Sequence, residues 1–252
     1  MFKAVYNNYK KPPISSQINW SHPLSKGLVA CFLCNEGNGT VVNNLANPSK
    51  NASVSVPSRN VWTGGKSGPA LKFGTDGDFA GSTSLRLSTK RQNVTIAAIV
   101  YPFSTQAGMI FYIGDDDGAG GAGGYGIGVF ANAGGSGGNI EVLFGGVRWL
   151  DSNKPVNLKQ WNLLSATIRG GGGNVETTFF INGLMVAKNT NDTQPNVIDT
   201  GYSIGDELND SKAVNGRRFL GLIDSCFLWE RVMTDQEMYY LYREPYCFIV
   251  PK

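Results

Sequence analysis

Short apolar or alternating stretches recur along the 252-residue chain, separated by clusters of Gly, Asn, Asp and Pro. A two-residue alternation, or a short apolar run between turn residues, is typical of a β-strand. The stretches that we predict as strands are residues 27–33, 70–74, 94–103, 109–113, 125–131, 139–144, 161–169, 175–181, 184–188, 202–205 and 219–229. Most of the chain is therefore expected to fold as β-structure.

Two of these stretches carry additional information. Residues 94–101 are apolar at successive positions and rich in β-branched side chains, which is typical of a strand covered on both faces. We therefore expect this strand in the middle of a sheet. Residues 175–181 lead into Asn182-Gly183, which supplies the two positive-φ residues of a type I′ turn. The following apolar run predicts a hairpin.

One segment near the end of the chain has a helical pattern. Thr234 and Glu237 have the spacing of a capping box, in which each side chain accepts a hydrogen bond from a free backbone N–H at the start of a helix. The apolar positions, three and four residues apart, are Met238, Leu241 and Tyr242. Pro245 limits the segment, because the residue before a proline avoids the helical region. We predict a helix from Asp235 to about Arg243.

About a dozen strands and one terminal helix, without a linker, fit a single all-β domain better than two domains. The expected fold is a two-sheet antiparallel sandwich with one short C-terminal helix. Residues 1–25 show no periodicity and are predicted to form an extended N-terminal arm, so that the domain covers residues 26–252. The Gly-rich stretches 118–124 and 133–138 are predicted to be long hairpin tips.

Several motifs occur in the order in which laminin-G-like, concanavalin A-like jelly rolls carry them. The matching stretches are ALKFGTDGDF (70–79), VTIAAIVYP (94–102), WNLLSAT (161–167), FFING (179–183), FLGLID (219–224) and MTDQEMYYLY (233–242). The resemblance spans about Leu28 to Arg243 and implies a concanavalin A-like jelly roll, with a structural hydrogen-bonding role for Asp224. Ile99 stands where the family usually has Trp, and Asn162-Leu163 replaces its histidine pair, so no family histidine is carried over.

The two ends of the domain resemble a narrower group. Residues 18–29 and 243–249 are similar to the edges of this domain in proteins of tailed bacteriophages, where it is commonly a virion surface component. This resemblance implies a non-enzymatic protein that is made in the host cytoplasm and decorates or cements the capsid. Its partners would be the major capsid protein or other virion proteins, with host or glycan contact as an addition, and a homo-oligomer is expected because such particles are symmetric.

The predicted arm would be the attachment device, since an irregular segment can order on a neighbouring subunit. The residues predicted to contact a partner are Phe2, Tyr6, Tyr9 and Trp20. The alternative function is a carbohydrate-binding lectin module of a bacterial surface or secreted protein. A signal peptide or a neighbouring catalytic domain in the full gene would favour that alternative.

Charge and hydropathy exclude two kinds of partner. The formal net charge is +3 and the basic residues are scattered, whereas nucleic-acid binding requires a concentrated positive stripe. The N-terminus lacks the apolar stretch of about 7–15 residues found in a secretory signal, and no run approaches the roughly 20 apolar residues of a membrane span. We therefore expect neither ordinary export nor a membrane segment.

Catalysis is not expected from the sequence. Glycoside hydrolases of the laminarinase type share this fold and carry Glu-x-Asp-x-Glu or a bulged form of it on one strand, which brings an acid and a nucleophile together. None of the seven glutamates begins such a pattern. A hydrolytic triad needs a base, and the single histidine, His22, lies in the predicted arm beside Pro23.

Three consecutive carboxylates form the most concentrated anionic site, at Asp115, Asp116 and Asp117. Carboxylate oxygens are ligands of Ca²⁺, but consecutive side chains diverge, so a solvated loop is the favoured interpretation and a Ca²⁺ site is the alternative. No other cofactor is expected.

A glycan site requires exposed aromatic rings beside amides or carboxylates, because the apolar face of a sugar stacks on a ring while its hydroxyls need polar partners. Trp62, Tyr125 and Trp149 lie near predicted turns, close to Asn, Gly and Asp, and are the candidates.

The four cysteines are Cys31, Cys34, Cys226 and Cys247. The Cys-x-x-Cys spacing of the first two could mean a redox pair or half of a zinc site, but no second pair follows. We predict that Cys31 and Cys226 pack in the core as small apolar residues. A disulfide between Cys34 and Cys247 is left open.

Overall fold

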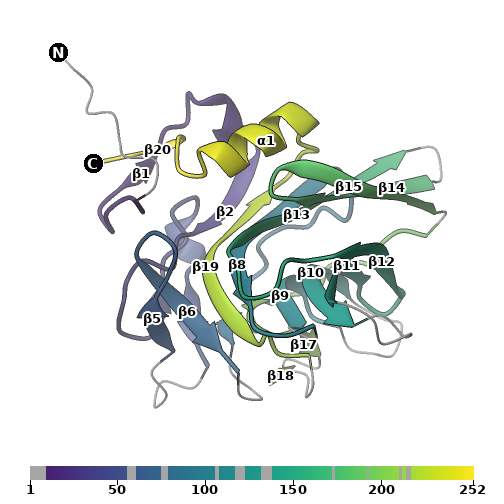
Figure 1. The fold of residues 1–252 in the computed structure, drawn as a ribbon, viewed down its shortest axis with the longest axis horizontal. Coiled ribbons are helices and arrows are strands. Elements are labelled where there is room, and N and C mark those ends of the chain that lie inside the picture. Colours follow the sequence, from purple (N-terminus) through teal and green to yellow (C-terminus); the bar gives the residue numbers. More distant parts are fainter. Residues whose placement is uncertain are drawn as a thin grey trace.

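The computed structural model describes residues 10–55, 61–74, 79–105, 108–116, 123–131, 138–171, 174–191, 193–209, 212–213 and 217–252 (Figure 1). Of the predicted contact and metal residues, Phe2, Tyr6, Tyr9 and Asp117 lie outside these ranges, as do most of the two Gly-rich stretches.

Two large antiparallel sheets form the domain (Figure 1). The first sheet has the order β12 (Arg148–Pro155), β11 (Gly138–Phe144), β10 (Gly124–Ala131), β9 (Gly108–Gly114), β16 (Tyr202–Ile204), β7 (Ala80–Ser82), β4 (Ala52–Val54) and β3 (Val41–Val42). The second sheet has the order β15 (Leu184–Asn191), β14 (Asn174–Ile181), β13 (Asn162–Gly171), β8 (Val94–Pro102), β19 (Gly221–Trp229), β6 (Pro69–Phe73) and β5 (Trp62–Gly64), with β2 (Leu28–Phe32) also pairing with β19.

The remaining elements are short. They are the strand pairs β1 (Gln17–Ile18) with β20 (Ile249–Val250) and β17 (Leu208–Asn209) with β18 (Lys212–Ala213), the 3₁₀ turns η1 (Pro23–Ser25) and η2 (Pro48–Lys50), and the helix α1 (Asp235–Arg243). No helix in the described part of the chain is both long enough and apolar enough to span a membrane. The all-β, two-sheet prediction with one C-terminal helix is confirmed.

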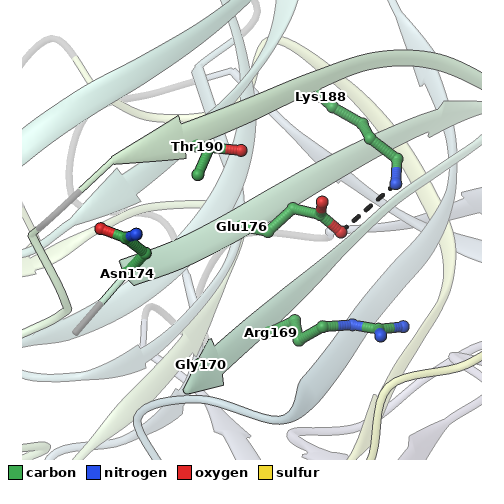
Figure 2. Close-up of a pocket in the computed structure, with 6 residues that line it drawn as sticks. All are labelled: Arg169, Gly170, Asn174, Glu176, Lys188 and Thr190. Carbon is green, nitrogen blue, oxygen red and sulfur yellow. Dashed lines mark hydrogen bonds and ion pairs between the residues drawn. The ribbon is translucent and has the colours of Figure 1, made fainter. Parts of the chain in front are cut away.

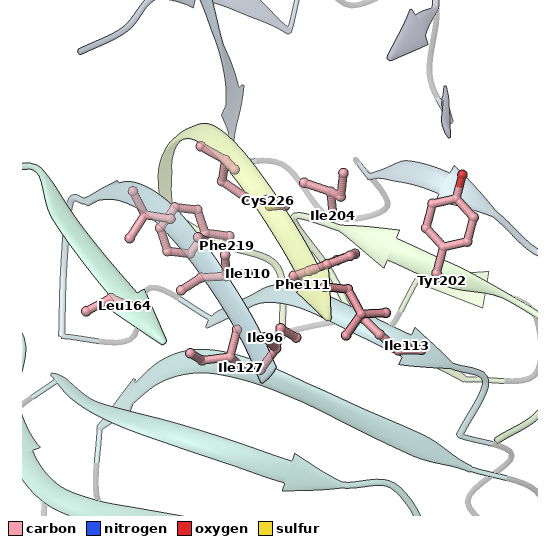
Figure 3. Packing of buried hydrophobic residues seen from close by; sticks show 14 of the residues in the cluster. Ile96, Ile110, Phe111, Ile113, Ile127, Leu164, Tyr202, Ile204, Phe219 and Cys226 are labelled. Carbon is pink, nitrogen blue, oxygen red and sulfur yellow. The ribbon is translucent and has the colours of Figure 1, made fainter. Parts of the chain in front are cut away.

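The main core lies between the two sheets. Alternate residues of β8, β10 and β13 point inward, so that Ile127 of β10 and Phe111 of β9 meet Ile96 of β8 and Leu164 of β13 (Figure 3). All four side chains are fully buried. This alternation is the period-two pattern from which the strands were predicted.

A second apolar cluster covers the opposite face of the second sheet. Ala97, Leu163 and Trp229 point outward from β8, β13 and β19, and α1 and the chain ends pack over them. The covering side chains include Leu24, Met238, Leu241 and Phe248. Strand β8 lies between β13 and β19 and is covered on both faces, as its uninterrupted apolar sequence predicts.

Local signals placed the helix and one hairpin correctly. The backbone N–H of Glu237 donates to Thr234 Oγ1 at 3.2 Å, and the Thr234 N–H donates to Glu237 Oε2 at 2.9 Å. The helix occupies the predicted residues. Asn182 and Gly183 have φ values of 54° and 77° and join β14 to β15. Strand β12 was missed because its sequence is mostly polar, and several two- and three-residue strands are too short to show a period.

The prediction of an extended arm is wrong for residues 11–25. The Lys11 N–H donates to the Ser67 carbonyl at 3.1 Å, β1 pairs with β20, and Trp229 Nε1 donates to the Leu24 carbonyl at 2.6 Å. The segment lacks periodicity because its contacts come from turns and a two-residue strand. Trp20 is an exception to this packing, since 59% of its surface is exposed.

A buried ion pair ties this segment to the rest of the domain. Asp224 is fully buried in β19, and its carboxylate lies 3.3 Å from Lys11 Nζ. The Tyr246 hydroxyl donates to Asp224 Oδ2 at 2.7 Å, and the Lys66 N–H donates to Oδ1 at 3.1 Å. Lys11 Nζ also donates to the main-chain carbonyls of Cys34, Pro69 and Asp224. The predicted structural role of Asp224 is confirmed.

All four cysteines are free thiols. Cys31 and Cys226 are fully buried, as predicted, and burial raises the pKa of each thiol. Cys34 belongs to the main core, whereas Cys247 packs against the cluster on the other side of the second sheet. The disulfide left open by the sequence is therefore not formed.

Replacing Lys11 with Met is expected to destabilise the protein by about 3–5 kcal/mol, because the Asp224 carboxylate would be left buried without its cation. Tyr246→Phe, which removes one hydrogen bond to the same carboxylate, is expected to cost about 1–3 kcal/mol. Urea denaturation at pH 7 measures both. A Lys11→Met variant as stable as the wild type would contradict the role given to this pair.

Candidate functional site

The face of the first sheet that points away from the core carries a mixed aromatic and charged layer. The strand register places its side chains in two rows, Tyr112–Gly126–Leu143–Trp149 and Met109–Gly128–Glu141–Asp151, with Phe130 beside Asn139. We call this surface the β9–β12 outer face. Met109, Tyr112 and Leu143 form a third apolar cluster here, separate from the main core, with Phe130 and Trp149 packed against it.

Two glycines let the larger side chains lie flat on this sheet. A Cβ atom at Gly126 would lie 2.7 Å from Met109 Sδ and 2.7 Å from Tyr112 Cδ2, and one at Gly128 would lie 2.3 Å from a ring carbon of Phe130. Any larger residue at either position would displace these side chains. The aromatic layer therefore depends on two side-chain-free positions in β10.

Phe130 and Trp149 form the accessible part of the layer. Their ring centroids are 4.4 Å apart with an interplanar angle of 65°, an edge-to-face arrangement. Both rings are half-buried. The Arg217 guanidinium lies over the Trp149 ring, 5.3 Å from its centroid, in a cation–π contact.

A buried carboxylate holds this arginine. Arg217 Nη1 donates to Glu207 Oε1 at 2.5 Å, and Glu207 is fully buried. Burial raises the pKa of Glu207 to about 7, with Arg217 opposing the rise and Asp116 adding to it. Burial, followed by Asp116 and Glu207, also raises the pKa of the Tyr112 hydroxyl.

A second pair of carboxylates lies on β11 and β12. Glu141 is directly opposite Asp151, and burial, followed by the Asp151 charge, raises the pKa of Glu141 to about 7. Asp151 accepts hydrogen bonds from Asn139 Nδ2 at 3.0 and 3.2 Å and from the Asn153 N–H at 2.7 Å. The face thus combines edge-to-face rings with amide, carboxylate and guanidinium groups.

A family model described as the concanavalin A-like lectin/glucanases superfamily matches residues 73–238. The chain belongs to this superfamily. Curated protein sequences gave no match. The phage virion context expected from the chain ends is not part of this finding.

Solved structures share the superfamily fold at low sequence identity. A Trypanosoma rangeli sialidase in complex with sialic acid matches with a TM-score of 0.60 and 16% identity, over 88% of this chain and 33% of the sialidase chain. Domain 4 of AbnA, a GH43 extracellular arabinanase from Geobacillus stearothermophilus, in complex with arabinotriose, matches with a TM-score of 0.55 and 17% identity, over 85% and 98% of the two chains. This chain therefore spans about a third of the sialidase and nearly all of the arabinanase domain.

Of the three aromatic residues predicted for a glycan site, Trp149 lies on the β9–β12 outer face. Tyr125 is fully buried, because it points the same way as Ile127 and Val129 into the main core. Trp62 is 9% exposed and also belongs to the core, with its indole N–H donating to a main-chain carbonyl at 2.9 Å. Neither ring can stack on a sugar in this structure.

The solvated loop favoured for the consecutive aspartates is wrong for the two that the structure describes. Asp115 and Asp116 are 7% and 5% exposed, and the Asp116 N–H donates to the Leu208 carbonyl at 2.9 Å. Across the described ranges, no three His, Cys, Asp or Glu side chains are grouped so as to hold a metal ion.

A polar depression of about 370 Å³ lies on the second sheet (Figure 2). It is lined by Arg169, Gly170, Asn174, Glu176, Lys188 and Thr190. Lys188 Nζ is paired with Glu176 Oε1 at 3.3 Å. This lining has no aromatic ring, so the depression lacks the stacking surface of the β9–β12 outer face.

Sequence reasoning missed Phe130, Glu141, Asp151 and Arg217. A carboxylate inside the apolar run 140–144 is a usable signal, because such a residue must point away from the core. No local sequence pattern could place Arg217 at this face. Its position depends on a long-range contact, in which the Met109 N–H of β9 donates to the Arg217 carbonyl.

Glu141→Gln is expected to make the protein more stable at pH 8 than the wild type, by up to about 3 kcal/mol. The unfolded carboxyl loses its proton near pH 4.5, whereas the folded one keeps it to about pH 7. Wild-type stability therefore falls as the pH rises between these values, and Gln removes that loss. Thermal unfolding at pH 5 and pH 8 measures the difference, with the half-exposed Glu176→Gln as control. An equal effect of Glu141→Gln at both pH values would contradict this account.

Proposed function

We propose that this protein is a non-catalytic carbohydrate-binding module whose glycan lies on the β9–β12 outer face. The observation that carries the proposal is the half-buried Phe130–Trp149 pair beside Asp151 and Arg217. The apolar face of a sugar stacks on such rings, and its hydroxyls donate to carboxylates and accept from guanidinium or amide groups.

Two comparisons support a carbohydrate ligand. The superfamily is described by its lectins and glucanases, and domain 4 of the arabinanase, which this chain matches over nearly the whole domain, has arabinotriose bound. A module of this size is compatible with attachment to a larger protein, as in the sialidase that it matches over a third of the length.

The surroundings of the carboxylates support binding without catalysis. Glycoside hydrolysis needs two carboxyl groups that both reach the scissile bond. Glu141 is 6% exposed, and Asp151 is occupied by Asn139 and Asn153. Glu141 is therefore too buried to reach a scissile bond, which leaves Asp151 as an acceptor for sugar hydroxyls without a partner acid. We therefore expect binding of oligosaccharides without release of shorter products.

Trp149→Ala is expected to weaken glycan binding by about five- to thirtyfold, because loss of one stacking ring costs on the order of 1–2 kcal/mol. Trp149→Phe, which keeps a ring, should retain most of the affinity. A glycan array followed by calorimetric titration of the best neutral oligosaccharide measures both, with Tyr239→Ala as a control for an exposed ring elsewhere. Affinity unchanged in a folded Trp149→Ala protein would refute this site.

We also propose that the protein is placed on the virion surface of a tailed phage, and the supporting observation concerns the two chain ends. The segments 18–29 and 243–249, which carry the resemblance, lie side by side: the Asn19 N–H donates to the Phe248 carbonyl at 2.8 Å. Next to this contact, His22 stacks on Tyr240 with ring centroids 6.2 Å apart. We call Trp20, His22, Tyr239 and Tyr240 the aromatic corner.

The aromatic corner is unusually exposed for its residue types. Trp20, Tyr239 and Tyr240 have exposed fractions of 59%, 47% and 41%. Tyr239 and Tyr240 lie on the solvent side of α1, where an amphipathic helix normally carries polar residues. This corner, in place of a free arm, is the proposed contact with the major capsid protein or another virion protein, in an expected homo-oligomer.

In purified particles from the source of this sequence, quantitative mass spectrometry should find the protein at a copy number that fits the symmetry of the shell. The double variant Trp20→Ala/Tyr240→Ala should lower that number without unfolding the domain, because both rings are exposed. Val197→Ala, also at an exposed apolar residue, is the control. Absence of the protein from particles would leave the carbohydrate-binding module as the proposed function.

A further inference from the structure

We infer that the glycan bound on the β9–β12 outer face is neutral, a chain of uncharged sugars without carboxylate or sulfate groups. This inference rests on the proposed carbohydrate-binding function and names the substrate class of that same site.

Carboxyl groups lie on both sides of the aromatic pair. Among the described residues, the register and contacts bring the carboxyl groups of Glu141 and Asp151 to the β11–β12 side, and those of Glu207 and Asp116 to the Tyr112 side. The cation in contact with the layer is Arg217. An anion beside Trp149 would therefore meet Glu141 and Asp151 next to a guanidinium that is already paired with Glu207.

The positive charge of Arg217 is already used by the protein. Its Nη1 lies 2.5 Å from Glu207 Oε1, and its guanidinium plane contacts the Trp149 ring. Glu207 is fully buried, so a ligand carboxylate that drew Arg217 away would leave a buried carboxyl group without its cation. Such a loss is costly in a low-dielectric interior. Arg217 is thus a poor anchor for an acidic sugar.

A neutral sugar suits the same groups. Ionised carboxylates only accept hydrogen bonds, and each sugar hydroxyl can donate one. Glu141 already keeps its proton to a higher pH than usual because of burial and Asp151, which indicates that this part of the face tolerates a further negative charge badly. Neutral hydroxyls add no charge to this part of the face.

The second sheet provides an internal comparison. In its polar depression, the exposed Arg169 points along the same side as Glu176 and Lys188, and no ion pair holds its guanidinium within the described residues (Figure 2). An acidic glycan that binds this protein is therefore expected there and not beside Trp149. The variant Arg169→Ala should weaken binding of an acidic glycan at the depression and leave binding beside Trp149 unchanged.

The test uses pairs of oligosaccharides that differ only in charge: neutral chains and the same chains oxidised at C6 to uronates, on an array and then by titration at about 50 mM salt. We expect the neutral member to bind at least about tenfold more tightly at a site lost in Trp149→Ala. The difference should shrink at about 1 M salt, where charges are screened. The difference in affinity between the neutral and uronate chains should also become smaller in Glu141→Gln and in Asp151→Asn, because these variants remove negative charge with little change of shape.

The outcomes separate the two proposals. Tighter binding of the uronate chain at a site that Trp149→Ala abolishes would overturn the inference and leave the proposed function intact. The inference would be supported if Arg169→Ala abolishes binding of the uronate chain while Trp149→Ala does not. The neutral chain should at the same time lose its binding in Trp149→Ala. Failure of both members of every pair to bind would overturn the proposed function itself. Thermal unfolding of each variant checks that it is folded.

Discussion

The burial of β8, β13 and β19 on both faces is the constraint on which the rest of the structure depends. One face of these strands forms the main core, and the other carries residues such as Ile99 and Trp229 that also need cover. The chain ends and α1 supply that cover, and the buried pair of Lys11 with Asp224 fixes the N-terminal segment in place. Because the terminal elements pack on the second sheet, no helix in the described part of the chain covers the outer face of the first sheet, which is covered by its own side chains.

That arrangement explains the composition of the β9–β12 outer face. Apolar side chains alone would form an exposed patch, which soluble proteins keep small. Here the rings of Tyr112 and Phe130 lie over Gly126 and Gly128, while Arg217 and several carboxyl groups surround them. The raised pKa of Glu141 and of Glu207 indicates that this polar layer costs stability. Costs of this kind are typical of surfaces retained for binding.

The fold was largely predictable from sequence because each of its signals is local. Alternation identified the long strands, Asn182-Gly183 identified the hairpin, and the Thr234–Glu237 spacing identified the helix. The site was less predictable, since the contact of Phe130 with Trp149 depends on the order and register of three strands. Tyr125 could have been excluded, because it alternates in step with the core residues of its own strand. The packing of residues 11–25 could not be foreseen, as it depends on single contacts to distant parts of the chain.

The distribution of charge is more informative about ligands than its total. A net charge of +3 gives no preference between acidic and neutral partners, because the charged groups are unevenly placed. Carboxyl groups lie around the aromatic rings of the first sheet, and the exposed guanidinium of Arg169, which forms no ion pair with another described residue, lies on the second. In the proposed function, the charge of a ligand would therefore decide which sheet it binds, and its apolar face would decide whether it stacks on a ring. The β9–β12 outer face joins half-buried, edge-to-face rings to carboxylate acceptors on one surface, which is the combination that the proposed neutral sugar requires.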